Sequence, residues 1–334
     1  MTEIKYGVTA IGNALVDVLA HAGDAFIEEQ DRLHGMKRGA MTLVDEERAE
    51  QLYGDMGPGV EVSGGSAGNT MACYASLGGK GAYIGKVADD QLGEVFYHDL
   101  KSMGVHYDTK PLAGGTTTGR CMILVTPDGQ RTMNTFLGAA VELGPEDIDE
   151  ELIAASAVTY LEGYLFDPPR AKEAFYKSAD IAHKAGRKVA LSLSDPFCVD
   201  RHRADFLDLV DRHVDILFAN EEEIKSLFEV FDWDQVPAAV EGKCDIVCLT
   251  RSEKGAVIFQ DGEIYEVPAQ KIDKIVDSTG AGDAYAAGFL YGYTQGQSLD
   301  VCSQIGSISA AEVISHIGPR PETLLSELIA KKAA

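Results

Sequence analysis

The sequence predicts an α/β protein in which a mostly parallel sheet carries helices on both faces and a small β-sheet forms a lid. Strand and helix patterns alternate from residue 145 to the end of the chain, as they do when crossover helices connect parallel strands. Two Thr-rich, strand-like runs at 116–126 and 131–137 have no helix beside them, and an Asp-Gly pair between them is a hairpin signal. We interpret this hairpin as part of a lid inserted into the α/β body.

The amino-terminal third of the chain supplies the other lid strands. A first strand at 6–12 is predicted to continue through 13–19, and short strands are predicted at 39–43 and 60–62 with no helix between them. The lid is therefore expected to comprise about residues 14–62 and 112–138 of a single domain that spans residues 1–334. The other elements before residue 104 are a helix at 70–77, a strand at 82–87 and a helix at 91–103.

The carboxyl-terminal half supplies most of the parallel sheet. Its predicted strands lie at 157–161, 188–193, 215–219, 245–250, 256–260 and 264–267. Its predicted helices lie at 145–154, 169–184, 200–212, 221–230, 284–293, 299–317 and 321–331. Ligands of such folds bind at the carboxyl ends of the strands, so polar residues that directly follow a strand are the first candidates for a site.

Composition excludes several classes of partner. The net charge is −24, from 29 basic and 53 acidic residues, which argues against binding to nucleic acid or to an anionic membrane surface. No apolar run approaches the roughly 20 residues of a membrane-spanning helix, and the first residues lead straight into a strand without a signal peptide. Six scattered cysteines are typical of buried free thiols, so we expect a cytoplasmic protein.

The segment Asp277-Ser-Thr-Gly-Ala-Gly-Asp283 follows a short apolar run at 274–276, which we expect to be a strand, and opens a helix of small, apolar residues. The backbone N–H groups of Gly280, Ala281 and Gly282 would point outward at the helix start, where they make a site for a phosphate-like anion. Asp283 would repel such an anion, so its presence makes sense if it removes a proton from an attacking hydroxyl. The alternative is a glycine-rich turn with Asp283 as a helix cap.

A second glycine-rich segment, residues 64–69, also opens a helix. Gly64 and Gly65 would let the backbone approach a ligand, and Asn69 offers both a donor and an acceptor to a sugar hydroxyl. Asn13 and Asp17 interrupt an apolar stretch near the first strand and are either ligand contacts or a turn Asn and a capping Asp. Neither glycine cluster has the spacing of a dinucleotide-binding fingerprint.

Two further polar segments follow strands. Asn220 and Glu223 come directly after the strand at 215–219, where a helix cap with a solvated helix face is the simpler interpretation. Thr250 to Gly255 follows the next strand and could place backbone beside the phosphates of a nucleotide.

These motifs resemble the ribokinase-like (PfkB) family of carbohydrate and nucleoside kinases over essentially the whole chain. The resemblance rests on residues 64–69 and on residues 277–283, in that order and spacing. It implies a Rossmann-like body with a β lid, ATP and Mg²⁺ as co-substrates, and transfer of the γ-phosphoryl group to a primary hydroxyl. Asp283 would then be the base, and Gly280, Ala281 and Gly282 the anion hole.

The resemblance also implies roles on the nucleotide side. Asn220 and Glu223 match an Asn-x-x-Glu motif tied to Mg²⁺ and phosphate through water. Thr250 and Gly255 match the nucleotide loop, together with the glycines at 280 and 282, although Ser252 stands where many members have glycine. Asp277 and Thr279 lie where some members bind a monovalent cation such as K⁺, which is left open.

On the substrate side the resemblance is to adenosine kinases within the family. Asp17, Gly65 and Asn69 match residues that bind the vicinal hydroxyls of a ribose, and Ser66 stands where ribokinases usually have lysine. Leu137 on the lid and Leu165 after a strand are candidate walls for the base, or plain core leucines.

The sequence therefore favours an ATP-dependent kinase that acts on the 5′-hydroxyl of adenosine. A free-sugar kinase of the same family is the alternative, and a nucleoside-binding protein without turnover is a third interpretation. The expected partner is a small nucleoside or sugar, with no nucleic acid and no membrane, in a monomer or homodimer.

Overall fold

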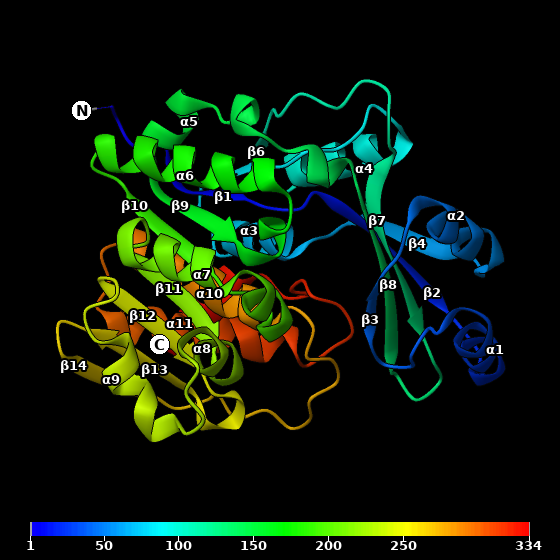
Figure 1. The fold of residues 1–334 in the computed structure, drawn as a ribbon. Helices are drawn as coiled ribbons and strands as arrows, with labels where there is room; N and C mark the ends of the chain where they lie inside the picture. Colours follow the sequence, from blue (N-terminus) through cyan, green and yellow to red (C-terminus); the bar gives the residue numbers. More distant parts are fainter. Residues whose placement is uncertain (1, 334) are drawn as a thin grey trace.

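The computed structural model describes residues 2–333, which form two sheets (Figure 1). Among these residues the larger or main sheet has nine strands in the order β14-β13-β12-β11-β10-β9-β1-β5-β6. All neighbours from β12 to β6 are parallel, and β13 and β14 add an antiparallel hairpin at one edge. The strands are β1 (Tyr6–Ile11), β5 (Gly81–Ile84), β6 (His106–Tyr107), β9 (Ser156–Glu162), β10 (Lys188–Ser192), β11 (Ile216–Asn220), β12 (Ile246–Thr250), β13 (Ala256–Gln260) and β14 (Glu263–Val267).

Helices cover both faces of the main sheet, and the central strands are continuous apolar runs because both of their faces are buried. One face is covered by α3 (Ser66–Ser76), α4 (Gln91–Ser102), α10 (Ala281–Thr294), α11 (Leu299–Val313) and α12 (Leu325–Ala333). The other is covered by α5 (Glu150–Ala154), α6 (Pro169–Lys184), α7 (Pro196–Arg212), α8 (Glu221–Phe228) and α9 (Val236–Val240).

A smaller sheet, the lid sheet, lies to one side of the main sheet (Figure 1). Its strand order is β3-β8-β7-β2-β4. The strands are β2 (Leu15–His21), β3 (Met41–Leu43), β4 (Gly59–Ser63), β7 (Thr118–Val125) and β8 (Arg131–Gly138). Helices α1 (Asp24–His34) and α2 (Glu46–Asp55) bury Ile27 and Leu52 against Met122, Leu124 and Phe136 on one face. The other face of the lid sheet carries Asp17, Cys121 and Thr135.

Two of the points where the chain crosses between the two sheets touch each other. The chain enters the lid through residues 12–14, between β1 and β2, and returns through Gly64 and Gly65, between β4 and α3. Gly65 has φ +80°, and a Cβ there would lie 2.3 Å from the carbonyl oxygen of Asn13, so only glycine fits. A Cβ at Gly64 would lie 2.3 Å from Oδ1 of Asp17. The two glycines therefore hold both polar residues at the junction of lid and body.

The predicted fold is confirmed, and four details of the prediction are wrong. Residues 13–19 do not continue β1, because the chain turns at Asn13 into β2 of the other sheet. Helices α1 and α2 occupy part of the region that was expected to hold only strands. The region 145–154 holds a 3₁₀ turn and the short helix α5 rather than one helix. The apolar run before Asp277 is not a strand, although the Val276 N–H donates to the Ile314 carbonyl at 2.9 Å.

Candidate active site

The start of α10 presents free backbone donors. Within residues 2–333 no hydrogen bond uses the N–H of Gly280, Gly282 or Asp283, whereas the Ala281 N–H donates to the Ser278 carbonyl at 3.3 Å. Gly280 has φ +78°, and a Cβ there would lie 2.7 Å from the backbone of Pro319. A Cβ at Gly282 would meet only open space. Three unpaired N–H groups at a helix amino terminus can bind an anion. The N–H of Ala281 is less available for this than expected, because it already donates to Ser278.

Asp283 lies in the first turn of α10 beside these donors and is only partly buried. Its Oδ1 accepts a hydrogen bond from the Ser66 hydroxyl at 2.5 Å, so the carboxylate faces the start of α3. Burial raises the pKa of Asp283 to about 7, the charge of Glu162 adds to the rise, and the hydrogen bonds from Ser66 and Asn69 oppose it. A carboxylate with a pKa near neutrality is suited to taking a proton at physiological pH.

Asp17 lies on the same side as Asp283 and is 7% exposed. Burial raises its pKa to about 6, against the opposing charges of Arg320 and Arg131. No hydrogen bond among residues 2–333 occupies its carboxylate, which is therefore available as an acceptor. Asn69, on the first turn of α3, is 6% exposed, and its Oδ1 accepts from Nε of Arg320 at 3.1 Å.

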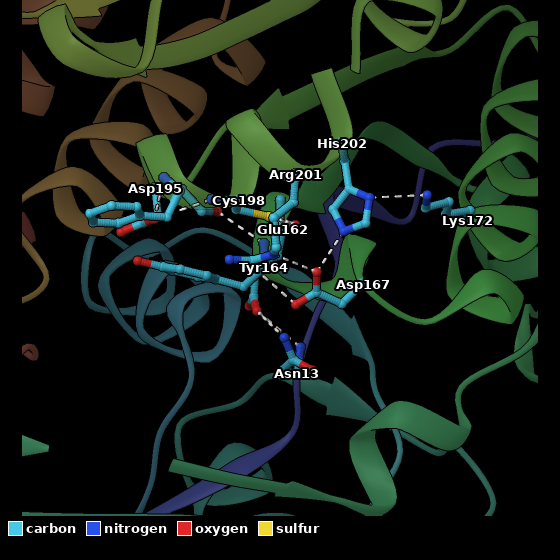
Figure 2. Close-up of polar contacts among 12 residues, drawn as sticks. Asn13, Glu162, Tyr164, Asp167, Lys172, Asp195, Cys198, Arg201 and His202 are labelled. Carbon is cyan, nitrogen blue, oxygen red and sulfur yellow. Dashed lines mark hydrogen bonds and ion pairs between the residues drawn. The ribbon is translucent and has the colours of Figure 1, made fainter. Parts of the chain in front are cut away.

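Glu162, at the carboxyl end of β9, fixes two neighbouring parts of the site. It is 1% exposed and accepts from Nδ2 of Asn13 at 2.8 Å, from the Asn13 N–H at 3.3 Å and from the Ala67 N–H at 2.7 Å. Figure 2 shows Glu162 and Asn13 joined across the site. Asn13 is therefore tied to the protein by Glu162, which leaves its Oδ1 and the second hydrogen of its Nδ2 for a substrate. Burial raises the pKa of Glu162.

A lid residue reaches the loop before α10. Nη1 of Arg131, on β8, lies 3.0 Å from Oδ2 of Asp277, and the two side chains are 5% and 9% exposed. The N–H groups of Thr279 and Gly318 also donate to Asp277, at 3.0 and 2.9 Å. No nitrogen of the Arg131 guanidinium has a well-aligned hydrogen bond within residues 2–333, so these donors remain available to an anion bound beside α10.

Asn220 and Glu223 form a reciprocal cap at the start of α8. The Glu223 N–H donates to Oδ1 of Asn220 at 2.8 Å, and the Asn220 N–H and Nδ2 donate to Glu223 at 2.9 and 2.6 Å. The helix face is not solvated there, because Glu223 is 6% exposed. Burial raises the pKa of Glu223 to about 7, to which the charge of Asp195 adds. Both residues are thus structural caps, and their link to Mg²⁺ stays a prediction.

The loop after β12 is a compact turn that includes the 3₁₀ helix Ser252–Lys254. Ser252 has φ +51°, which explains why glycine would suit this position. Gly255 has φ +91°, and a Cβ there would lie 2.1 Å from the Val267 carbonyl oxygen. Arg251 turns away to pair with Glu221 at 2.9 Å. Thr250 ends β12 and is partly exposed at the carboxyl edge of the sheet.

The two predicted apolar walls have different positions. Leu137, on β8, lines a cavity of about 280 Å³ between the lid sheet and the segment that follows it. Leu165 is fully buried in the core beneath α6 and α7, so it offers no surface to a substrate and its assignment is wrong. The neighbouring Tyr164 is partly exposed and lies among the carboxylates of the site (Figure 2); burial raises its pKa, and the charges of these carboxylates add to the rise. Tyr164 therefore replaces Leu165 as the candidate aromatic wall.

A polar cluster supports the segment that carries Tyr164. Asp167 accepts from Nε2 of His202 at 2.6 Å and from the guanidinium of Arg201 at 3.1 and 3.2 Å (Figure 2). Lys172 lies 3.2 Å from Nδ1 of His202. The cluster joins the turn after β9 to α6 and α7 and so fixes this wall of the site.

Residues 2–333 contain no group of three His, Cys, Asp or Glu side chains arranged to hold a metal ion. Nor does any helix in this range combine the length and apolar character needed to cross a membrane.

Besides Tyr164, sequence reasoning missed the contacts of four residues in or beside the site, namely Ser66, Arg131, Glu162 and Arg320. Each acts through a partner far away in the sequence, and only Ser66 lies within a recognised motif, residues 64–69. Ser66 and Arg131 adjoin predicted elements, and an isolated charge within a strand pattern was the available signal for Arg131 and for Glu162.

Comparisons with known proteins agree with the geometry. The family described as "pfkB family carbohydrate kinase" matches residues 42–324. A structure of adenosine kinase from Sinorhizobium meliloti is 53% identical, with a TM-score of 0.90 over 99% of this chain and 100% of the other. A probable sugar kinase from Rhizobium etli is 51% identical, with a TM-score of 0.91 over 100% and 99%. Adenosine kinase of Saccharomyces cerevisiae is 27% identical over 93% of this chain and 96% of its own.

Proposed function

The chain belongs to the pfkB family of carbohydrate kinases and is a kinase, and from this premise we propose that it transfers the γ-phosphoryl group of ATP to the 5′-hydroxyl of adenosine. The observation that carries the proposal is the position of Asp283 beside the unpaired N–H groups of Gly280 and Gly282. An acid next to an anion hole has a chemical use only if a proton must leave an attacking group while negative charge develops nearby.

In the proposed reaction the 5′-hydroxyl gives its proton to Asp283 as its oxygen forms a bond to the γ-phosphorus. The bond from that phosphorus to the bridging oxygen breaks, and ADP leaves with the electron pair. The amides at the start of α10 would hold the phosphoryl oxygens, and the guanidinium of Arg131, paired with Asp277 in the loop before α10, would add positive charge to stabilise them. Since Asp283 must be ionised and its pKa is raised to about 7, we expect turnover to fall as the pH drops through about 7.

The residues present fit ATP and Mg²⁺. Thr250 and the turn that ends at Gly255 lie at the same sheet edge as the anion hole and are the candidate nucleotide contacts. Mg²⁺ keeps several waters and binds few protein groups directly, so Glu223 and Asn220 would hold it through water. When bound, Mg²⁺ neutralises the charge of the phosphates.

The residues do not fit a monovalent cation. Both carboxylate oxygens of Asp277 already accept N–H groups, and Arg131 supplies a positive charge 3.0 Å away. We therefore leave K⁺, and with it a metal role for Thr279, out of the proposal.

Adenosine is favoured over a free sugar by two features. Ser66, where ribokinases usually have lysine, holds the base Asp283. Leu137 and the cavity beside it offer an apolar surface of the kind a purine needs and a small sugar does not. The Sinorhizobium relative is named an adenosine kinase, whereas the Rhizobium relative is named a probable sugar kinase, so the free-sugar kinase remains the second candidate.

One assay separates the two candidates. The protein is incubated with Mg-ATP and, in turn, adenosine, other nucleosides, ribose and fructose, and ADP release is followed. Turnover on adenosine alone supports the proposal. Turnover on ribose or fructose with none on adenosine supports a sugar kinase, and tight nucleoside binding without ADP release supports a binding protein. The cytoplasmic location, the oligomeric state and the single-domain assignment stay predictions.

A further inference from the structure

Arg320 connects the polar groups on the substrate side of the site and has no role in the function proposed above. It lies between α11 and α12, outside every motif in the sequence. Its Nε donates to Oδ1 of Asn69 at 3.1 Å, and its Nη1 donates to the hydroxyl of Ser63 at 2.9 Å. Its Nη2 is buried and has no hydrogen-bond partner within residues 2–333. A buried guanidinium of this kind is costly unless the site uses it.

The contact with Arg320 decides which way the Asn69 amide points. Because Oδ1 of Asn69 accepts from Arg320, its Nδ2 is the end that is left to face Asp283 and the substrate. An unrestrained Asn could present either its donor or its acceptor to a sugar. Arg320 therefore makes Asn69 a hydrogen-bond donor at this position.

Arg320 also sets the charge around Asp17. The groups that act on this carboxylate or respond to it are Arg320 and Arg131, which favour its ionised form, and Cys121 and Asp283, whose pKa values its charge raises. Arg320 has the larger effect of the two arginines. In its ionised form Asp17 only accepts hydrogen bonds. An acceptor at Asp17 and a donor at Asn69 together match two adjacent hydroxyls, one donating and one accepting.

We propose that Arg320 is a positioning residue for vicinal sugar hydroxyls: it turns the amide of Asn69 toward the substrate as a donor and supplies positive charge to Asp17, so that the site prefers ribosides to deoxyribosides. This inference rests on the proposed function for the identity of the ligand.

The first test measures the dissociation constants of adenosine, 2′-deoxyadenosine and 3′-deoxyadenosine by calorimetry, so that it does not depend on turnover. Arg320→Met removes the donors and the charge but keeps much of the apolar stem. We expect the dissociation constant of adenosine to rise roughly 10- to 100-fold and that of at least one deoxynucleoside to rise much less. The ratio of the two constants, which expresses the preference for adenosine, should therefore fall.

The second test follows the same constants between pH 5 and pH 8. In the wild type, adenosine binding should weaken as the pH falls through about 6, where Asp17 takes up a proton. Loss of Arg320 leaves the ionised form of Asp17 less stabilised, so in Arg320→Met this weakening should begin at a higher pH. Arg320→Lys keeps the charge and should restore the wild-type pH dependence, but it should not restore the full preference, because an ammonium lacks the planar fork.

Arg120→Met is the matched control. Arg120 is, like Arg320, a largely buried arginine with nitrogens that have no hydrogen-bond partner within residues 2–333, but it lies on the lid strand β7 and packs over Tyr53, under α2 and away from Asp17. The substitution Arg120→Met should leave both the nucleoside preference and the pH dependence of binding unchanged. If Arg320→Met does not fold, Arg320→Lys alone carries the test through its reduced preference.

Three outcomes overturn the inference: an unchanged preference in Arg320→Met and Arg320→Lys, an unchanged pH dependence in a folded Arg320→Met, or the same changes in Arg120→Met. A wild-type protein that binds adenosine but does not release ADP would refute the proposed function and leave these binding tests valid. A wild type that binds no adenosine would refute both.

Discussion

Replacing Glu162 with glutamine tests whether this buried carboxylate both holds the site together and sets the basicity of Asp283. Glu162 accepts three N–H groups, from the backbone and side chain of Asn13 and from the backbone of Ala67. In Glu162→Gln one acceptor oxygen becomes an NH₂ group, so at least one buried donor loses its partner. Such a loss costs about 1–3 kcal/mol. The neutral amide avoids the desolvation that raises the pKa of Glu162, so we expect the low end of this range at pH 8.

The effect of Glu162→Gln on activity has a definite sign. The negative charge of Glu162 raises the pKa of Asp283, so its removal lowers that pKa and should move the acid limb of kcat to lower pH. The measurement is kcat from pH 5 to pH 9 at saturating adenosine and Mg-ATP, together with urea unfolding at pH 8. Asp215→Asn is the control, since Asp215 also accepts a backbone N–H, from Val189 at 2.7 Å, but lies at the opposite edge of the sheet. An acid limb that stays in place or moves to higher pH would refute the reasoning.

Four other substitutions probe the same site. Ser66→Ala removes a hydrogen bond that lowers the pKa of Asp283, so the acid limb of kcat should move to higher pH, in the opposite direction to Glu162→Gln. A shift to lower pH would contradict this prediction. Gly280→Ala should lower the free energy of unfolding by about 1–3 kcal/mol in urea, because Gly280 has φ +78°. Gly282→Ala should be as stable as the wild type but lose turnover, because its Cβ would enter the open space beside the anion site. Equal stability of the two variants would contradict this prediction. Arg131→Met leaves the buried carboxylate of Asp277 without its ion-pair partner, so it should lower the free energy of unfolding by roughly 3–5 kcal/mol in the same assay and also reduce kcat. Unchanged stability would exclude a structural role for the ion pair.

The main sheet could be predicted from the sequence because its signals are local. Alternating apolar strands and amphipathic helices fix the order of elements, and helix α6 (Pro169–Lys184) matches its prediction at both ends. The lid helices were harder, because α1 and α2 bury only two residues each. Helix α2 was missed although Asp45 caps it and acidic residues fill its first turn, which is a recognisable start signal.

The site was predictable only where a motif is continuous in the chain. The segments 64–69 and 277–283 mark two helix starts, and the fold brings them together through the hydrogen bond of Ser66 to Asp283. Asn13 and Glu162 are 149 residues apart, and Asn69 and Arg320 are 251 apart, so no spacing rule connects them. Leu165 failed for a different reason: it lies in the 3₁₀ turn Gly163–Phe166 that follows β9, where Leu165 points into the core and the neighbouring Tyr164 is partly exposed.

The role of Asp283 as the base is tested most directly by Asp283→Asn. This change keeps the shape of the side chain and removes its ability to take a proton, so single-turnover phosphorylation of adenosine should fall on the order of 10²–10⁴-fold. Binding of ATP and adenosine, measured separately, should persist, and thermal unfolding at pH 8 should show a protein at least as stable as the wild type, because a partly buried charge has been removed. A rate within a few-fold of the wild type would show that Asp283 is not the base.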